Sequence, residues 1–246
     1  MGESTQNNEL RKLFSRQAKW TKSARDWLIQ TKIGTPLSSV LEVGCGCGDV
    51  LHEVRGDGYT VGLDINLKYL KELKVDGILG DGHFLPFRDS SFDMVYCHFS
   101  LLWFFEPVIV IKEMARVAKS WICCMAEYDL GARLDYPLEF EYIRDKLADG
   151  IISDGGDPYV GRKLYEYFNE AGLKAEVGAY CHVMDHEQML AGFESEWSFI
   201  QEFTDMDSKE LNILKKRELN SIQGKNRFLF TPVFYALSKK TEKKKT

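Results

Sequence analysis

Short apolar runs alternate with segments of helical spacing through the first half of the chain. The first run, at residues 38–43, ends in a cluster of glycines. Further apolar runs follow at residues 59–64, 77–81, 91–104 and 120–129, and helical spacing separates them over residues 49–54, 67–73 and 107–117. Strongly apolar strands that alternate with helices are usually buried on both faces. The pattern therefore predicts a parallel β-sheet that is covered by helices on both sides.

The two ends of the chain carry a less regular pattern. Residues 9–32 predict one or two helices ahead of the first strand, and residues 159–171 predict a helix closed by Gly172. Further expected elements are a helix at 138–147 and strands at 174–185 and 227–239. The last two strands are separated by about forty residues of mixed helical pattern, which is typical of an insertion with its own role.

The charge balance of the chain narrows its class of partners. The length of 246 residues suits one large α/β domain. The net charge is −5, and because the end of the chain from Lys239 to Thr246 holds five Lys and one Glu, the preceding residues carry −9. Such an acidic body argues against binding to a nucleic-acid backbone, which requires a basic face.

The composition also predicts the compartment. No apolar run approaches the ~20 residues that a membrane span needs. The polar residues 1–12 lack the apolar segment of a signal peptide. Six cysteines in a chain of this size do not suggest a disulfide framework. We therefore expect a cytoplasmic protein with reduced cysteines and no membrane span.

The most informative segment is the glycine cluster after the first strand. Gly44, Gly46 and Gly48 stand at alternate positions before the next helical pattern, and Asp64 closes the second strand twenty residues after Gly44. Glycines let a ligand approach the main chain closely, and an acid at the end of the second strand accepts hydrogen bonds from ribose hydroxyls. The pattern predicts a site for a nucleoside-containing ligand.

Acidic residues distinguish between two such ligands. In a dinucleotide site, the position of Asp49 would be a third glycine beside the pyrophosphate, and Glu42 would also lie close to that anion. Both acids suit a ligand with a cationic head and no phosphate. S-adenosylmethionine, which carries an ammonium and a sulfonium, is such a ligand.

Five motifs over residues 38–128 resemble those of a known family. They read E-V-G-C-G-x-G, G-L-D-I, G-D-G-x-x-L-P-F, S-F-D-M-V and E-M-A-R-V. In this order they resemble the class I S-adenosylmethionine-dependent methyltransferases, and most of all the small-molecule branch that contains the ubiquinone/menaquinone-type enzymes. Where that family usually has K-P-G-G before the fifth strand, this chain reads V-A-K-S-W.

The resemblance implies a Rossmann-like methyltransferase fold, a doubly wound, mostly parallel sheet of seven strands with helical insertions and the last strand antiparallel. It divides the chain into N-terminal helices at 1–37, a cofactor-binding half at 38–129, the remaining sheet at 130–239 and a basic tail at 240–246. We expect the aromatic-rich insertions at 130–158 and 186–225 to cover the carboxyl ends of the strands as a lid over the acceptor. The alternative is that they extend the core at the sheet edge or form a dimer interface.

The resemblance also assigns cofactor-binding residues. Gly44, Cys45 and Gly46 would line the methionine part of S-adenosylmethionine, Glu42 would support the loop or the ammonium, and Asp64 would hold the ribose hydroxyls. Ile65 would pack on adenine, Asp81 would accept from the adenine amino group, Gly82 would offer its backbone N–H, and Cys97 and His98 would lie near the methyl donor.

Two residues are candidates for a catalytic role. His98, at the carboxyl end of the fourth strand, would act as a general base or orient the acceptor, or else its side chain caps a loop. Glu127, together with Asp129, would bind an amine or hydroxyl of the acceptor, or else cap the loop after the fifth strand. We expect no metal site, because Cys123 and Cys124 face opposite sides of a strand and cannot ligate one ion.

The sequence thus predicts an S-adenosylmethionine-dependent methyltransferase that acts on a small-molecule acceptor by in-line transfer. Two alternatives stay open at this point, namely a methyltransferase that acts on RNA or protein, and a non-catalytic protein that binds the cofactor.

Overall fold

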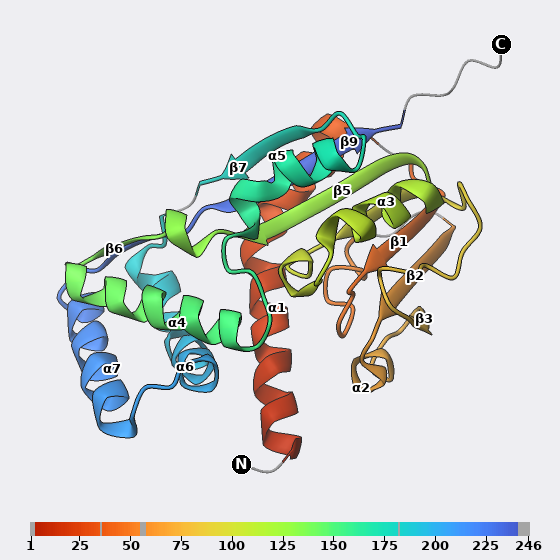
Figure 1. The fold of residues 1–246 in the computed structure, drawn as a ribbon. Helices are drawn as coiled ribbons and strands as arrows, with labels where there is room; N and C mark the ends of the chain where they lie inside the picture. The colour runs from red at the N-terminus through yellow and green to blue at the C-terminus, as the bar shows by residue number, and fades with distance from the viewer. Residues whose placement is uncertain (1–2, 35, 55–57, 182, 241–246) are drawn as a thin grey trace.

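One sheet of seven strands forms the centre of the molecule (Figure 1). The computed structural model describes residues 3–34, 36–54, 58–181 and 183–240, and all statements on structure concern these ranges. The strand order is β3-β2-β1-β4-β5-β9-β7. The strands are β1 (Ser39–Val43), β2 (Tyr59–Asp64), β3 (Asp76–Leu79), β4 (Phe92–Cys97), β5 (Ala118–Tyr128), β7 (Glu176–Tyr180) and β9 (Val233–Lys239). In the described sheet β9 runs antiparallel to both of its neighbours, β5 and β7, and all other paired strands are parallel. This confirms the predicted doubly wound, mostly parallel architecture.

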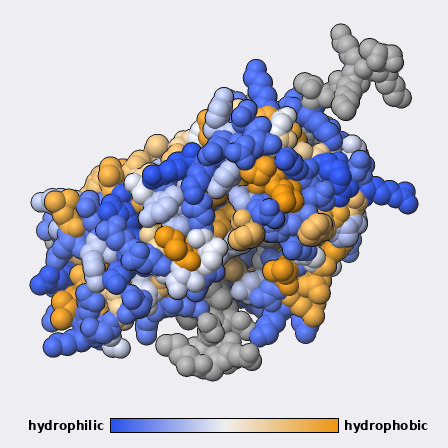
Figure 2. Space-filling view, viewed as in Figure 1, coloured by the Kyte–Doolittle hydropathy of each residue, from blue (hydrophilic) through white to orange (hydrophobic). Residues whose placement is uncertain are grey.

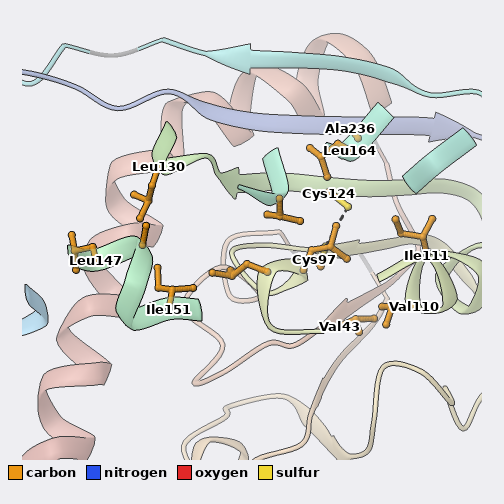
Figure 3. Packing of buried hydrophobic residues seen from close by; sticks show 14 of the residues in the cluster. Val43, Cys97, Val110, Ile111, Cys124, Leu130, Leu147, Ile151, Leu164 and Ala236 are labelled. Carbon is orange, nitrogen blue, oxygen red and sulfur yellow. Dashed lines mark hydrogen bonds between the residues drawn. The ribbon is translucent and has the colours of Figure 1, made fainter. Parts of the chain in front are cut away.

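Alternating side chains of the strands bury the two faces of this sheet. Val43, Cys97 and Cys124 pack on the face covered by α3 (Pro107–Val117) and α5 (Val160–Glu170) (Figure 3). The neighbouring positions, such as Met94 and Cys123, pack on the opposite face with α1 (Glu3–Leu28) and the π-helical turn η1 (Ile29–Ile33). The short helix α2 (Leu67–Leu70) follows β2. Opposite orientation of Cys123 and Cys124 is confirmed by these two clusters.

A second layer of helices lies beside α1 (Figure 1). It consists of α4 (Glu141–Ser153), α6 (His186–Phe203) and α7 (Ser208–Gln223), with a two-stranded sheet of β6 (Leu134–Tyr136) and β8 (Phe228–Phe230). The layer contacts the segment that follows β4, since Asp157 N donates to Leu102 O at 2.8 Å and the rings of Trp103 and Phe203 lie 6.1 Å apart. Both insertions expected from the sequence therefore meet next to the carboxyl ends of β4 and β5.

Most predicted elements are present, and three differ from the prediction. The helix expected at 49–54 is wrong. Gly46 and Gly48 both have positive φ, so a helix cannot begin before Asp49, and the few residues that follow form turns. The strand expected at 227–239 is split into β8 and β9 at Pro232, which has no N–H to donate to a ladder. The strand expected at 174–185 is shorter, and β6 was not predicted.

The surface shown in Figure 2 is mostly hydrophilic, with hydrophobic side chains scattered in small groups. Among the described helices, none has both the length and the apolar character needed to cross a membrane. Of the basic tail expected at 240–246, residues 241–246 lie outside the described residues. Lys240 packs against the sheet, where its Nζ donates to Ala115 O and Ala118 O at 2.8 Å.

A buried network of charges joins the helical layer to the second sheet. Asp135 on β6 accepts from Arg133 and from Arg227, and Arg227 Nε also donates to Glu218 Oε1 on α7 at 2.8 Å. The other oxygen of Glu218 accepts from Trp197 Nε1 on α6 at 2.8 Å. The guanidinium of Arg227 is fully buried and shared between two carboxylates. This network therefore fixes β6, β8, α6 and α7 relative to one another.

Replacement of Arg227 tests that role. We expect Arg227→Met to lower the free energy of unfolding by about 3–5 kcal/mol, because it leaves the carboxylates of Asp135 and Glu218 without a shared cation. Chemical denaturation monitored by circular dichroism measures the change. Arg217→Met is the matched control, since Arg217 pairs with Glu139 on the surface and should cost no more than about 1 kcal/mol. Equal effects of the two substitutions would contradict the structural role of the network.

Candidate active site

The glycine loop after β1 folds back on the end of β2. Both Gly44 N and Cys45 N donate to Leu63 O, at 2.8 and 3.1 Å. Gly44 and Gly46 have φ of 72° and 51°, in the left-handed region that side chains disfavour. A Cβ atom on Gly44 would also lie 2.6 Å from Cβ of Ser100. The sharp turn at this position therefore requires glycine.

Asp64 joins the glycine loop to the end of β2. Its Oδ2 accepts from Gly46 N and its Oδ1 accepts from Asn66 N, both at 2.8 Å. Burial raises the pKa of this carboxyl, while the backbone donors oppose the rise. Each oxygen keeps a second lone pair, so the carboxylate can also accept from the two hydroxyls of a ribose. Ile65, next to it, is 74% exposed and is available to a flat ring.

Asp81 and Gly82 lie at the adjacent loop after β3. Asp81 Oδ1 accepts from His83 N at 2.9 Å and lies 2.6 Å from His83 Nδ1, and these contacts lower the pKa of Asp81. Gly82 packs beneath the ring of Phe104, because a Cβ atom there would lie 2.8 Å from that ring. The structure brings Gly44, Asp64 and Gly82 to one edge of the sheet, and their contacts with a cofactor stay a prediction.

Glu42 points to the face of the sheet that α1 covers. It is 2% exposed, and Tyr96 donates its hydroxyl to Oε2 of Glu42 at 3.0 Å. Burial raises the pKa of Glu42 to about 8. A carboxyl that is mostly protonated at pH 7 offers little charge to an ammonium. Of the two roles expected for Glu42, the geometry favours support of the loop, and the cofactor contact stays a prediction.

Glu127 lies near the carboxyl end of β5, and its buried side chain contacts the end of β4 and the loop that follows it. Its Oε1 accepts from Leu101 N at 3.1 Å and from the Cys97 thiol at 3.6 Å, and the sulfur atoms of Cys97 and Cys124 are 3.4 Å apart (Figure 3). Oε2 of Glu127 is buried with no partner among the described residues. Burial raises the pKa of Glu127 to about 8. Glu127 thus supports the loop after β4, and its role toward an acceptor stays a prediction.

His98 is held by α1. Its Nε2 lies 2.8 Å from Thr21 Oγ1 and 3.4 Å from Arg25 Nη1, and Arg25 forms an ion pair with Glu53. Burial and the nearby guanidinium of Arg25 lower the pKa of His98 well below its usual range. The ring is therefore neutral and engaged, and the predicted role as a base would require this contact to open. No sequence signal pairs His98 with Thr21, which lies 77 positions earlier.

Three stacked rings stand next to His98. Phe99 stacks on Tyr128 with 4.3 Å between ring centroids and on Trp20 of α1 with 6.0 Å, and we call these three residues the aromatic cluster. Phe99 has φ of 49°, an unusual conformation for a bulky residue. Such strain is often found at functional sites. The aromatic cluster was not predicted from the sequence, although the positions of Phe99 and Tyr128 at strand ends were a signal.

A cavity of about 720 Å³ opens next to the aromatic cluster. It lies between α1, α4, α6, α7 and the end of β5, and Trp20 and Tyr128 form part of its wall. Its apolar lining includes Leu130, Leu147, Ile151, Met184, Met189, Phe193, Phe199, Ile222 and Leu229. Figure 3 shows Leu130, Leu147 and Ile151 together beside α1. The volume and the lining are those of a small-molecule site.

The remaining candidate groups of the described residues are metal ligands, cysteines and Asp129. Among the described residues, no three His, Cys, Asp or Glu side chains gather as metal ligands. All six cysteines are free, and only Cys181 is exposed. Asp129, at the end of β5, forms a bidentate ion pair with Arg162, with both distances 2.6 Å.

Comparisons with known proteins agree with this arrangement. A family model described as a methyltransferase domain matches residues 41–121. The chain is 32% identical over 190 residues to a demethylmenaquinone methyltransferase of Bacillus cereus, which covers 65% of this chain and 78% of that protein. It is 30% identical over 161 residues to an uncharacterized methyltransferase of Schizosaccharomyces pombe, which covers 56% of this chain but only 57% of that protein.

A solved structure supports the fold. A SAM-dependent methyltransferase of Thermotoga maritima superposes with a TM-score of 0.58 and covers 96% of this chain and 95% of its own. The sequence identity is 16%, so this likeness concerns the fold alone. It confirms the Rossmann-like methyltransferase fold expected from the motifs.

The raised pKa of Glu127 predicts a dependence of stability on pH. The folded chain holds this proton up to about pH 8, whereas an ordinary Glu releases it near 4.5. The contribution of Glu127 is therefore complete below pH 4.5 and is lost as pH rises toward 8. Glu127→Gln stays neutral, so we expect it to gain at least about 1 kcal/mol over the parent between pH 5 and pH 8.

Urea unfolding at the two pH values measures this gain, with the exposed residue Glu194 replaced as Glu194→Gln for control. If the stability of Glu127→Gln and of Glu194→Gln depends on pH in the same way as that of the parent, the assignment of a protonated Glu127 in the folded chain is wrong.

Proposed function

The chain belongs to the S-adenosylmethionine-dependent methyltransferases of the menaquinone-type branch, and we propose that it methylates a small apolar molecule bound in the cavity beside α1. The observation that carries the proposal is the position of this cavity. Trp20 and Tyr128 form part of its wall, and Phe99, which stacks on both, follows the end of β4, where the family's cofactor motifs converge. When bound, the cofactor supplies an electrophilic methyl group on a sulfonium.

The residues at the sheet edge fit this cofactor. We assign the ribose hydroxyls to Asp64, the adenine ring to Ile65 and the adenine amino group to Asp81. The turn at Gly44 and Gly46 is where the methionine part would lie. The ring of Phe14 on α1 covers this turn, since a Cβ on Gly46 would lie 3.5 Å from it, and so α1 excludes water from the site.

The transfer itself depends on position more than on proton transfer. His98 is neutral and bonded to α1, and Glu127 is protonated and bonded to a loop. In-line transfer from a sulfonium needs a nucleophile at the correct distance and angle. Binding that holds the two reactants in this geometry supplies much of the reduction of the activation barrier. The aromatic cluster and α1 would orient the acceptor toward the edge formed by Cys97 and His98.

The walls of the cavity favour a small acceptor over a macromolecule. Its lining comes from four helices and the end of β5, and it is mostly apolar. A nucleic-acid substrate would require a basic face, whereas the chain is acidic. We place the reaction in the cytoplasm, because free, mostly buried thiols are typical of a reducing compartment.

Ligand binding tests the proposal directly. We expect isothermal titration calorimetry to detect S-adenosylhomocysteine but not NADH, because Asp49 stands where a dinucleotide site has glycine. Binding of NADH without binding of S-adenosylhomocysteine would overturn the proposal. A screen of small apolar acceptors with methyl-labelled S-adenosylmethionine, followed by mass spectrometry, then measures transfer.

Substitution of Asp64 tests the assigned ribose contact. Asp64→Ala should weaken S-adenosylhomocysteine binding by about 2–4 kcal/mol, because it leaves two ribose hydroxyls without an acceptor in a partly buried site. Asp81→Ala should cost less, since the Asp81 side chain is 44% exposed and water can replace it. Calorimetry on variants with parent-like circular dichroism gives both values. An unchanged dissociation constant for Asp64→Ala would remove the ribose role.

A further inference from the structure

The buried charge network has one unused hydrogen-bonding group. Both oxygens of Asp135 and both oxygens of Glu218 accept from Arg133, Arg227 or Trp197. Arg227 uses all three of its nitrogens, because Nη1 donates to Tyr136 O and Phe228 O. All carboxylate oxygens of the network thus accept a hydrogen bond, and the group left without one is a donor.

That donor is Nη1 of Arg133. Nε and Nη2 of Arg133 donate to Asp135 at 2.8 and 3.1 Å, which fixes the plane of the guanidinium. Among the described residues, the side-chain hydrogen bonds of Arg133 come from Nε and Nη2 and none from Nη1, and Nη1 is not one of the fully buried atoms that lack a partner. Arg133 is 5% exposed and lines the cavity. We infer that the side chain presents a rigid cationic N–H to a mostly apolar space.

Cations outnumber carboxylates among the described residues that line the cavity. Among the described residues that line the cavity, the cations are Lys12, Arg16, Lys19 and Arg133, and the carboxylates are Glu196 and Glu218. Glu196 is paired with Arg16 at 2.6 Å, and Glu218 accepts from Arg227 and Trp197. These two carboxylates and Asp135 also raise the pKa of Arg133 against the effect of burial, so its guanidinium stays charged. The described lining is basic in a chain with a net charge of −5.

We propose that Arg133 binds an oxyanion of the acceptor, so that the preferred substrates are compact apolar acids such as carboxylates or phenolates. This inference rests on the proposed function, because it takes the cavity to be the acceptor site. A bound oxyanion completes the hydrogen bonds of Arg133, and the apolar walls hold the rest of the molecule. Arg133 is then a residue that determines specificity, and a guanidinium already oriented by Asp135 needs little reordering on binding.

A matched pair of probes tests the inference. 2-Naphthoate and 2-naphthalenemethanol have similar shapes, and only the first is an anion at pH 7.5. We expect calorimetry on the full chain, with and without saturating S-adenosylhomocysteine, to show naphthoate binding at least about tenfold more tightly. Equal affinities, or no binding of either probe at millimolar concentration, overturn the inference.

Variants assign the preference to one side chain. Arg133→Met should remove the preference by weakening naphthoate binding alone, and Asp135 keeps Arg227 as its partner in this variant. Arg133→Lys, which keeps the charge but not the fixed geometry, should reduce the preference and serves if Arg133→Met does not fold. Arg16→Met removes a different cation of the lining and should leave the preference intact.

Three further results have a defined meaning. A preference that survives in Arg133→Met, or is unchanged in Arg133→Lys, overturns the role of Arg133. Loss of the preference in Arg16→Met alone assigns the anion to α1 instead and also overturns it. A chain that shows the probe preference but binds no S-adenosylhomocysteine contradicts the proposed function, while the assignment of Arg133 stands.

Discussion

The hydrogen bonds between β2 and the glycine loop determine the geometry of the site. Leu63 O accepts two successive N–H groups of the loop, and the Asp64 carboxylate accepts a third. The approach is so close that a Cβ on Gly62 would lie 2.6 Å from the sulfur of Cys45. The loop is thereby held beside the point between β1 and β4 where the strand order reverses, which is where open α/β sheets bind ligands.

Two carboxyls beneath this edge are tolerated because they are protonated. Glu42 lies on the α1 face and Glu127 lies between β4 and β5, and burial raises the pKa of each to about 8. As neutral groups they accept hydrogen bonds from Tyr96 and from the loop after β4 without placing two negative charges under the ligand site. The framework is thus rigid and nearly uncharged, while Asp64 remains at the surface of the site.

The sequence was sufficient for elements whose signals are local. Apolar runs identified β1, β2, β4 and β5, and the helix at residues 107–117 matches α3. The glycine spacing and Asp64 predicted which edge of the sheet carries the site. Contacts between distant residues left no such signal. Arg227 contacts Asp135, which lies 92 positions earlier in the chain. The cavity is lined by side chains of α1 up to Trp20 and then by residues from Tyr128 onward, more than a hundred positions later. The turns after Gly48 escaped prediction because residues 49–54 have a composition that suits a helix, whereas the short described segment forms only turns.

The single helix α1 contacts three parts of the site. Phe14 covers the glycine loop, Thr21 holds His98, and Gln17 donates to the Tyr128 hydroxyl at 3.0 Å at the cavity wall. A nucleoside at the loop and an acceptor in the cavity would therefore share one wall. If one ligand spends free energy in ordering this helix, the second would not spend it again, and the two affinities would then be cooperative. Such coupling is reciprocal by thermodynamic necessity, so each ligand raises the affinity for the other by the same factor.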